Sequence, residues 1–69
     1  MKPQQKRILE KVFIKGNVND IIECLKIFGY NTTIITNKLI DNFELDQEYI
    51  LKSKSNNIKN YIKDIINSI

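Results

Sequence analysis

Apolar residues recur with the 3.6-residue period of an α-helix in four separate segments of the chain. The first segment lies between Pro3, a residue favoured at helix starts, and Gly16, a residue type common just past helix ends. Its apolar positions are Ile8, Leu9, Val12 and Phe13. This pattern predicts a helix over residues 3–15.

The second and third segments are separated by a short turn. The second helix is predicted over residues 19–28 by apolar positions at Val18, Ile21, Ile22, Leu25 and Phe28. Asn17 or Asn19 would cap its start, and Gly29 would mark its end. Tyr30 and Asn31 then supply an apolar residue and a cap for a helix over residues 31–43, whose apolar face contains Ile35, Leu39 and Phe43.

The clearest amphipathic pattern is the last one, over residues 55–68, with Ser55 as its cap. Its apolar stripe consists of Ile58, Tyr61, Ile62, Ile65, Ile66 and Ile69. Residues 44–54 are ambiguous, because Tyr49-Ile50-Leu51 fits either a short strand or a helical turn, and the spacing of Leu45 and Tyr49 favours the turn. We therefore predict a single all-α domain over residues 1–69, with a tri-helical core followed by a C-terminal amphipathic helix.

Composition excludes several kinds of chemistry. A chain of 69 residues supports one small core, and with no histidine and a single cysteine it has no intramolecular disulfide, Cys/His zinc site or imidazole base. We expect no enzyme activity, no cofactor and no metal. Cys24, beside Leu25, is expected to be a reduced and buried thiol. The acidic residues Asp41, Glu44, Asp46 and Glu48 lack the spacing of a calcium loop and are expected to form a solvated face.

The formal net charge of +3 is distributed unevenly. Basic residues gather in residues 2–15 and 52–63, on either side of the acidic stretch. Such a mild basic excess is compatible with a partner that carries phosphates. The chain has no apolar run of the roughly 18 residues that a membrane span requires and no secretory signal, so we expect a cytoplasmic protein without a membrane partner.

The order of the predicted elements is that of a helix-turn-helix motif. Two helices are followed by a tight turn that contains Gly29 and then by a helix with a polar outer face. The segment Gly29-Tyr30-Asn31-Thr32-Thr33-Ile34-Ile35-Thr36-Asn37-Lys38-Leu39 resembles the recognition half of bacterial helix-turn-helix regulators, including the Fis type, although Leu25 replaces their usual small alanine. The resemblance implies that base edges in the major groove are read by Asn31, Thr32, Thr33, Thr36 and Asn37.

The partner would then be duplex DNA, and the protein would be a sequence-specific transcriptional regulator or a regulator of the plasmid or phage type. Phosphate contacts are expected from Lys6, Arg7, Lys11, Lys15, Lys38, Lys52 and Lys54. The apolar stripe of residues 55–69 either packs back on the other helices or forms a homodimer; we favour the homodimer, because two recognition helices about 34 Å apart read successive major grooves.

Three alternatives stay open. Gly29 and Asn31 are also ordinary helix caps, which would leave the threonines as the solvated face of a scaffold. The acidic stretch would suit a small inhibitor or accessory protein of a mobile element, of the anti-defence type, that binds another protein. Finally, Leu25-Lys26-Ile27-Phe28-Gly29-Tyr30 resembles the Leu-x-x-Met-Gly-Phe loop of ubiquitin-associated domains, with Tyr49-Ile50-Leu51 about three residues too close to match their last helix.

Overall fold

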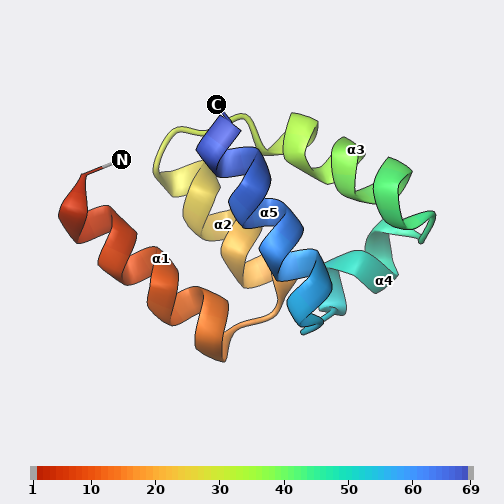
Figure 1. Ribbon diagram of the computed structural model, residues 1–69, viewed down its shortest axis with the longest axis horizontal. Coiled ribbons are helices and arrows are strands. Elements are labelled where there is room, and N and C mark those ends of the chain that lie inside the picture. The colour runs from red at the N-terminus through yellow and green to blue at the C-terminus, as the bar shows by residue number, and fades with distance from the viewer. Residues whose placement is uncertain (1, 69) are drawn as a thin grey trace.

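Residues 2–68 are described by a computed structural model, and in this part of the chain the structure is helical without strands. The prediction of an all-α protein is therefore confirmed. The helices are α1 (Pro3–Lys15), α2 (Val18–Ile27), α3 (Thr32–Phe43), α4 (Gln47–Lys52) and α5 (Asn56–Ser68). In Figure 1, α2 lies behind α5, α1 lies along one side of this pair, and α3 and α4 lie on the other.

The buried core is built mainly on α2 and α5. Four residues of α2 are buried, namely Val18, Ile21, Ile22 and Leu25, as the helical pattern predicted. The predicted apolar face of α3 is also confirmed, because Ile35 and Leu39 are fully buried. At the end of α3 the ring of Phe43 packs edge-on against Tyr61 of α5, with the ring centroids 5.6 Å apart. These contacts fix α3 against α5.

The start of α2 is set by a capping box. The side chain of Asn17 accepts a hydrogen bond from the Asp20 amide at 3.0 Å, and the Asp20 carboxylate accepts one from the Asn17 amide at 3.0 Å. Of the two predicted cap residues, Asn17 is therefore the cap. Two amides at this end of the helix are satisfied by these side chains.

Gly29 ends α2 in the left-handed conformation that the sequence predicts, with a φ of 93°. The Tyr30 amide donates to the Leu25 carbonyl and the Gly29 amide to the Lys26 carbonyl, each at 3.0 Å. These two bonds form a Schellman motif, which favours glycine because a side chain is strained at this φ. Asn31 is the N-cap of α3 by position, but its side chain makes no capping hydrogen bond.

Gly16 follows the end of α1, but not because the turn needs the left-handed conformation that glycine often supplies after a helix. Its φ is −94°, so the turn does not require a left-handed residue. Instead, a Cβ atom at this position would lie 2.8 Å from the Asp20 Cβ and Oδ2 atoms and 2.9 Å from the Val12 carbonyl oxygen. Because the Asp20 side chain belongs to the capping box, it cannot move aside without losing its bond to Asn17. Glycine is required here by close approach.

Residues 44–54 contain α4, which resolves the ambiguity of this segment in favour of a helix. Ile50 is fully buried, whereas Tyr49 is 63% exposed. The loop after α4 also holds the start of α2, because the Val18 amide donates to the Ser53 carbonyl at 2.9 Å. That bond satisfies one of the amides that a helix leaves free at its N-terminus.

The end of α1 is held by two lysines of α5. Lys59 is buried, and its ammonium donates a hydrogen bond of 2.7 Å to the Phe13 carbonyl, which lies in the last turn of α1. Lys63 lies over the Phe13 ring, with its ammonium 5.0 Å from the ring centroid. A cation at a helix C-terminus is favoured by the partial negative charge of the last carbonyls. The two lysines therefore join α5 to α1.

The apolar stripe of the last helix faces the protein's own core, which corrects its assignment to a dimer interface. Ile58, Ile62 and Ile65 have exposed fractions of 5% or less, and Tyr61 and Ile66 pack against them as partly buried residues. The three isoleucines belong to the same buried core cluster as residues of the other helices, so they are not available to a second copy. Ile69, the sixth predicted interface residue, lies outside the described residues.

Candidate interaction surfaces

The predicted base-reading residues lie around a groove between α2, α3 and α4. The groove has a volume of about 270 Å³, and the side chains that line it come from all three helices: Asn19, Ile22, Glu23, Lys26, Thr32, Thr33, Thr36, Asn37, Gln47 and Leu51. Four of the five predicted residues are among them. The fifth, Asn31, is exposed at the start of α3 and does not line the groove.

Two of these residues are less available to bases than the sequence indicates. Thr32 is only 8% exposed, which corrects its assignment as a reading residue, because it lies on the face of α3 turned toward the interior. Thr36 is half-buried, and its hydroxyl donates its proton to the Thr32 carbonyl at 2.8 Å, so it could meet a base only as an acceptor or through its methyl group. Thr33 and Asn37 are exposed. The surface that could read bases is thus narrower than the sequence indicates.

The walls of this groove also differ from those of an open recognition helix. Glu23 places a carboxylate in the groove, and its oxygen lies 4.0 Å from the ammonium of Lys26. On the opposite side, Gln47 and Leu51 of α4 form the second wall. A carboxylate repels phosphates, so the Glu23 side chain disfavours a duplex backbone in this groove.

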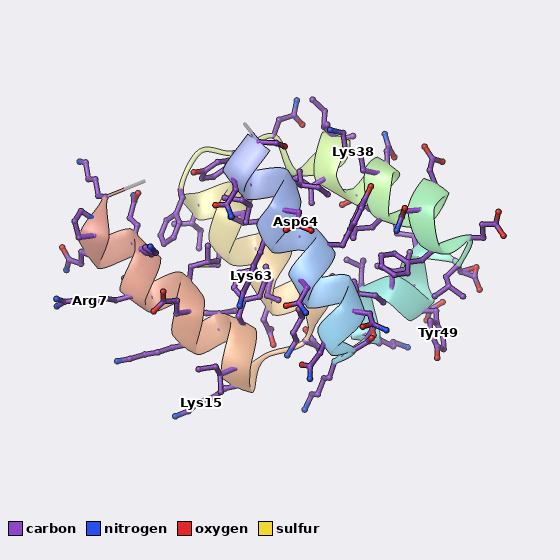
Figure 2. The ribbon with its side chains drawn as sticks, viewed as in Figure 1. Arg7, Lys15, Lys38, Tyr49, Lys63 and Asp64 are labelled. Atoms are coloured by element: carbon purple, nitrogen blue, oxygen red, sulfur yellow. The ribbon has the colours of Figure 1, made fainter. Side chains whose placement is uncertain are left out.

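The predicted phosphate-contacting residues fall into separate groups. Four are exposed on α1: Lys6, Arg7, Lys11 and Lys15. Figure 2 shows Arg7 and Lys15 extending from α1 at one end of the molecule, while Lys38 extends from α3 on the other side. The cations of α1 therefore do not border the exposed face of α3, and the structure does not bring the two groups together.

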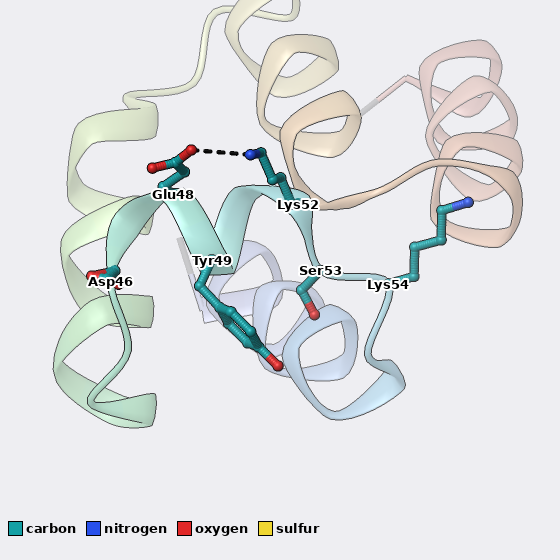
Figure 3. Close-up of a pocket in the computed structure, with 6 residues that line it drawn as sticks. All are labelled: Asp46, Glu48, Tyr49, Lys52, Ser53 and Lys54. Atoms are coloured by element: carbon teal, nitrogen blue, oxygen red, sulfur yellow. Dashed lines mark hydrogen bonds and ion pairs between the residues drawn. The ribbon is translucent and has the colours of Figure 1, made fainter.

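The remaining two predicted cations lie at the end of α4 and in the loop that follows it. The Lys52 ammonium lies 3.0 Å from a carboxylate oxygen of Glu48, in an exposed ion pair. Lys54 is exposed in the loop before α5. Both lysines line an open hollow of about 550 Å³ together with Asp46, Tyr49 and Ser53 (Figure 3). Acidic and basic groups are mixed in this hollow, so its local charge is near neutral.

Apolar side chains are exposed within the basic surface of α1. Ile8 is 46% exposed and Ile14 is 79% exposed. Arg7, Lys11 and Lys15 are spaced four residues apart and share the outer face of the helix between these isoleucines. We call Arg7, Ile8, Lys11, Ile14 and Lys15 the α1 surface. It combines positive charge with uncovered apolar area.

The junction of α3 and α4 carries several acidic side chains, and Lys52 and Lys54 border it on the side of the hollow. Residues 41–51 contain four acidic residues and no lysine or arginine: Asp41, Glu44, Asp46 and Glu48, all exposed. Leu45 and Tyr49 are exposed among them, at 36% and 63%. We call these six residues the α3–α4 corner. Figure 1 shows it and α1 at opposite ends of the longest axis of the molecule, which extends over 33 Å.

The sequence pattern does not predict that Ile14 and Tyr49 are exposed apolar residues. Ile14 nevertheless stands outside the predicted apolar positions of its helix. Ile8 was placed among those positions, and its exposure corrects that part of the pattern. The signal for Ile14 was therefore an isoleucine between Phe13 and Lys15 with no place in the periodic stripe. Tyr49 could not be placed until its segment was known to be helical.

Other chemical groups contribute little. Cys24 is half-buried, and burial raises the pKa of its thiol, which keeps the group protonated. In residues 2–68, no cluster of three or more histidine, cysteine, aspartate or glutamate residues is arranged to hold a metal ion. None of the helices in that range is both long and apolar enough to cross a membrane. Comparison with protein-family models, with curated proteins and with solved structures finds no match for this chain.

Proposed function

We propose that this chain is a protein-binding module without catalytic activity, which docks through the α1 surface onto an acidic and partly apolar surface of a partner. The observation that carries the proposal is the exposure of Ile8 and Ile14 beside Arg7, Lys11 and Lys15. Protein interfaces combine apolar and polar side chains, and the α1 surface presents both kinds on one helix, with the three cations between the two isoleucines. A phosphate backbone, by contrast, offers nothing for the two isoleucines to pack against.

The distribution of charge supports protein binding over base reading by α3. Phosphate contacts provide much of the affinity of DNA-binding proteins, so the cations must lie beside the reading helix. Here the four cations of α1 lie away from α3, and the end of α3 joins the acidic α3–α4 corner. A duplex laid along α3 would meet Glu23 and the acidic corner before any lysine of α1.

The first test is capture of the partner by a photo-crosslinking residue placed at position 14. Ile14 is 79% exposed, so the substitution leaves the core intact. A matched control carries the same residue at position 60, which is exposed on the outer face of α5. We expect a covalent adduct with a protein from position 14 and none from position 60. Equal capture from both positions, or from neither, contradicts the proposal.

A second candidate is the DNA-binding regulator indicated by the sequence, with a tri-helical helix-turn-helix core. It is favoured by the Schellman turn at Gly29 between α2 and α3 and by the exposed Thr33, Asn37 and Lys38. Binding to a pool of random duplex DNA, measured at about 50 mM and 200 mM salt, separates the two functions. The protein-binding module predicts weak binding that Asn37→Ala leaves unchanged. Enrichment of one sequence, lost in Asn37→Ala, would establish the regulator instead.

Either function suits the cytoplasm, where a single cysteine stays reduced. As a protein-binding module, the chain fits the role of a small inhibitor or accessory protein, such as those of mobile elements. Such a protein acts by occupying a surface of its target, and it requires a stable scaffold with exposed docking residues rather than a cleft. The buried faces of α2 and α5 provide that scaffold, and α1 carries the docking residues.

A further inference from the structure

We propose that the α1 surface binds the α3–α4 corner of a second copy of this chain, so that copies associate head to tail. The inference rests on the proposed function, since it names the partner of the α1 surface. The acidic and apolar surface that α1 requires is present at the other end of the same molecule. The α1 surface of one copy then binds the α3–α4 corner of the next copy.

Charge complementarity between the two ends is the first argument. Residues 2–15 contain five basic residues and one acidic residue, whereas residues 41–51 contain four acidic residues and no basic one. Opposite potentials steer two surfaces together and fix their orientation. The side chains that carry these charges are exposed at both ends, although Glu48 is paired with Lys52.

Apolar complementarity is the second argument. The α1 surface exposes Ile8 and Ile14, and the corner exposes Leu45 and Tyr49. These are four of the six large apolar residues that are exposed in residues 2–68, the others being Ile27 and Ile34. Docking the two ends would bring the exposed apolar side chains of one surface against those of the other, with the charged side chains of α1 between its two isoleucines. Tyrosine is enriched in interfaces because its ring gives a large contact area at low conformational cost.

The charges also decide the symmetry of the assembly. A two-fold dimer places the same surface of each copy together. Two α1 surfaces in contact would oppose lysines and arginines, and two corners in contact would oppose carboxylates, so both symmetric arrangements are repelled. Contact between unlike ends avoids this repulsion. Because the ends lie at opposite extremes of a 33 Å axis, repetition of the contact gives an open chain or a closed ring of copies.

The interface is small, so association should depend on concentration and salt. A helix of 13 residues is roughly 20 Å long at 1.5 Å per residue, which limits the contact to one helix face. Interfaces of this size are weak. Salt screens the rim charges, because the Debye length falls from about 10 Å at 0.1 M to about 3 Å at 1 M.

Sedimentation velocity on the purified full chain tests the inference, from about 10 µM to about 1 mM protein, a span that covers weak dissociation constants. We expect the mean mass of the wild type to rise above the 8.1 kDa of one copy with concentration and to fall when salt is added. A wild type that stays at the mass of one copy throughout would overturn the proposal.

Two variants, each damaged at one end, test the head-to-tail arrangement. Arg7→Gln/Ile14→Gln weakens the α1 surface, and Asp46→Asn/Tyr49→Gln weakens the corner. All four residues are exposed, and asparagine at position 46 keeps a good helix-capping residue. We expect each variant alone to stay a single copy. An equimolar mixture should form complexes of two copies and no larger, because it contains one intact pair of surfaces.

The controls separate this inference from the proposed function. Asn60→Asp, on the outer face of α5, should associate like the wild type, and circular dichroism verifies that each variant is folded. A mixture that remains as single copies while the wild type associates would overturn the head-to-tail contact. If the wild type stays a single copy but position 14 captures a different protein, self-association is wrong and the proposed function stands. If position 14 also captures nothing, both are wrong.

Discussion

Lys59 offers the sharpest test of how α1 is attached to the rest of the molecule. Its ammonium donates to the Phe13 carbonyl at 2.7 Å, and the residue is 6% exposed. That carbonyl lies in the last turn of α1, where the helix itself provides no donor. We predict that Lys59→Met, which keeps the apolar stem and removes the charge, destabilises the protein by about 1–3 kcal/mol.

The magnitude follows from two opposing effects. Loss of a hydrogen bond from a charged donor costs about 1.5–3 kcal/mol, and loss of a cation at a partly buried helix end costs up to about 2 kcal/mol. Against these, methionine relieves the penalty for removing the ammonium from water, which amounts to several kcal/mol for a buried charge. We expect the first two effects to prevail, because Phe13 would keep a buried carbonyl without a partner.

Urea denaturation measures the net effect. For a small domain with a slope of about 1 kcal/mol per molar urea, a loss of about 2 kcal/mol lowers the midpoint by about 2 M. Lys54→Met is the matched control, since Lys54 is exposed. Hydrogen exchange should accelerate in the last turn of α1 more than in α2. A Lys59→Met variant as stable as the Lys54→Met control, or more stable, would refute the reasoning and show that desolvation of the ammonium dominates.

Three further predictions follow from the fold. Gly16→Ala should destabilise the protein by about 1–3 kcal/mol in a thermal melt, because the new Cβ would overlap Asp20 and the Val12 carbonyl; a melt like that of the wild type would mean that the turn moves freely. Asn17→Ala should cost about 0.5–2 kcal/mol through loss of the α2 cap, and Asn19→Ala, exposed on the same helix, should cost less. Cys24 should react more slowly with iodoacetamide in the folded protein than in urea at the same pH, because burial raises the pKa of its thiol. The thiol of the unfolded chain therefore loses its proton at a lower pH than the folded one, so the free energy of unfolding should fall as the pH rises above 9.0. Equal alkylation rates in the two states would contradict the burial of this thiol.

Helical periodicity predicted most of the fold, because the core residues are strongly apolar and regularly spaced. The predicted range of the first helix matches α1, and the others begin within one residue of the observed starts. The segment around α4 was ambiguous because one helical turn contains too few positions to establish a period, and the burial of Ile50 comes from contacts with α2 and α3 that the segment itself does not reveal.

The candidate sites were harder to predict, because an amphipathic stripe does not say what covers it. The isoleucines of α5 fit a dimer seam and an intramolecular core equally well by spacing, and only the positions of α2 and α3 decide between them. For the same reason, the sequence alone assigns the cations of α1 and the polar face of α3 to one DNA-binding surface. They are separated because α2 and α5 lie between the helices that carry them.

The burial of the α5 stripe is what gives the two ends of the molecule their importance. Of the large apolar residues on α5, Ile58, Ile62 and Ile65 are used in the core, so its outer face presents side chains such as Asn60, Lys63 and Asp64. A partner that needs apolar contact must therefore dock elsewhere, and most of the remaining exposed apolar area lies on α1 and at the α3–α4 corner. The apolar side chains of α1 lie among basic residues, and those of the α3–α4 corner lie among acidic residues. In the proposed contact, charge therefore selects which two surfaces meet, and apolar contact stabilises their complex. A DNA-binding function would leave this pairing of charge and apolar area at both ends without a purpose, whereas docking between proteins uses both.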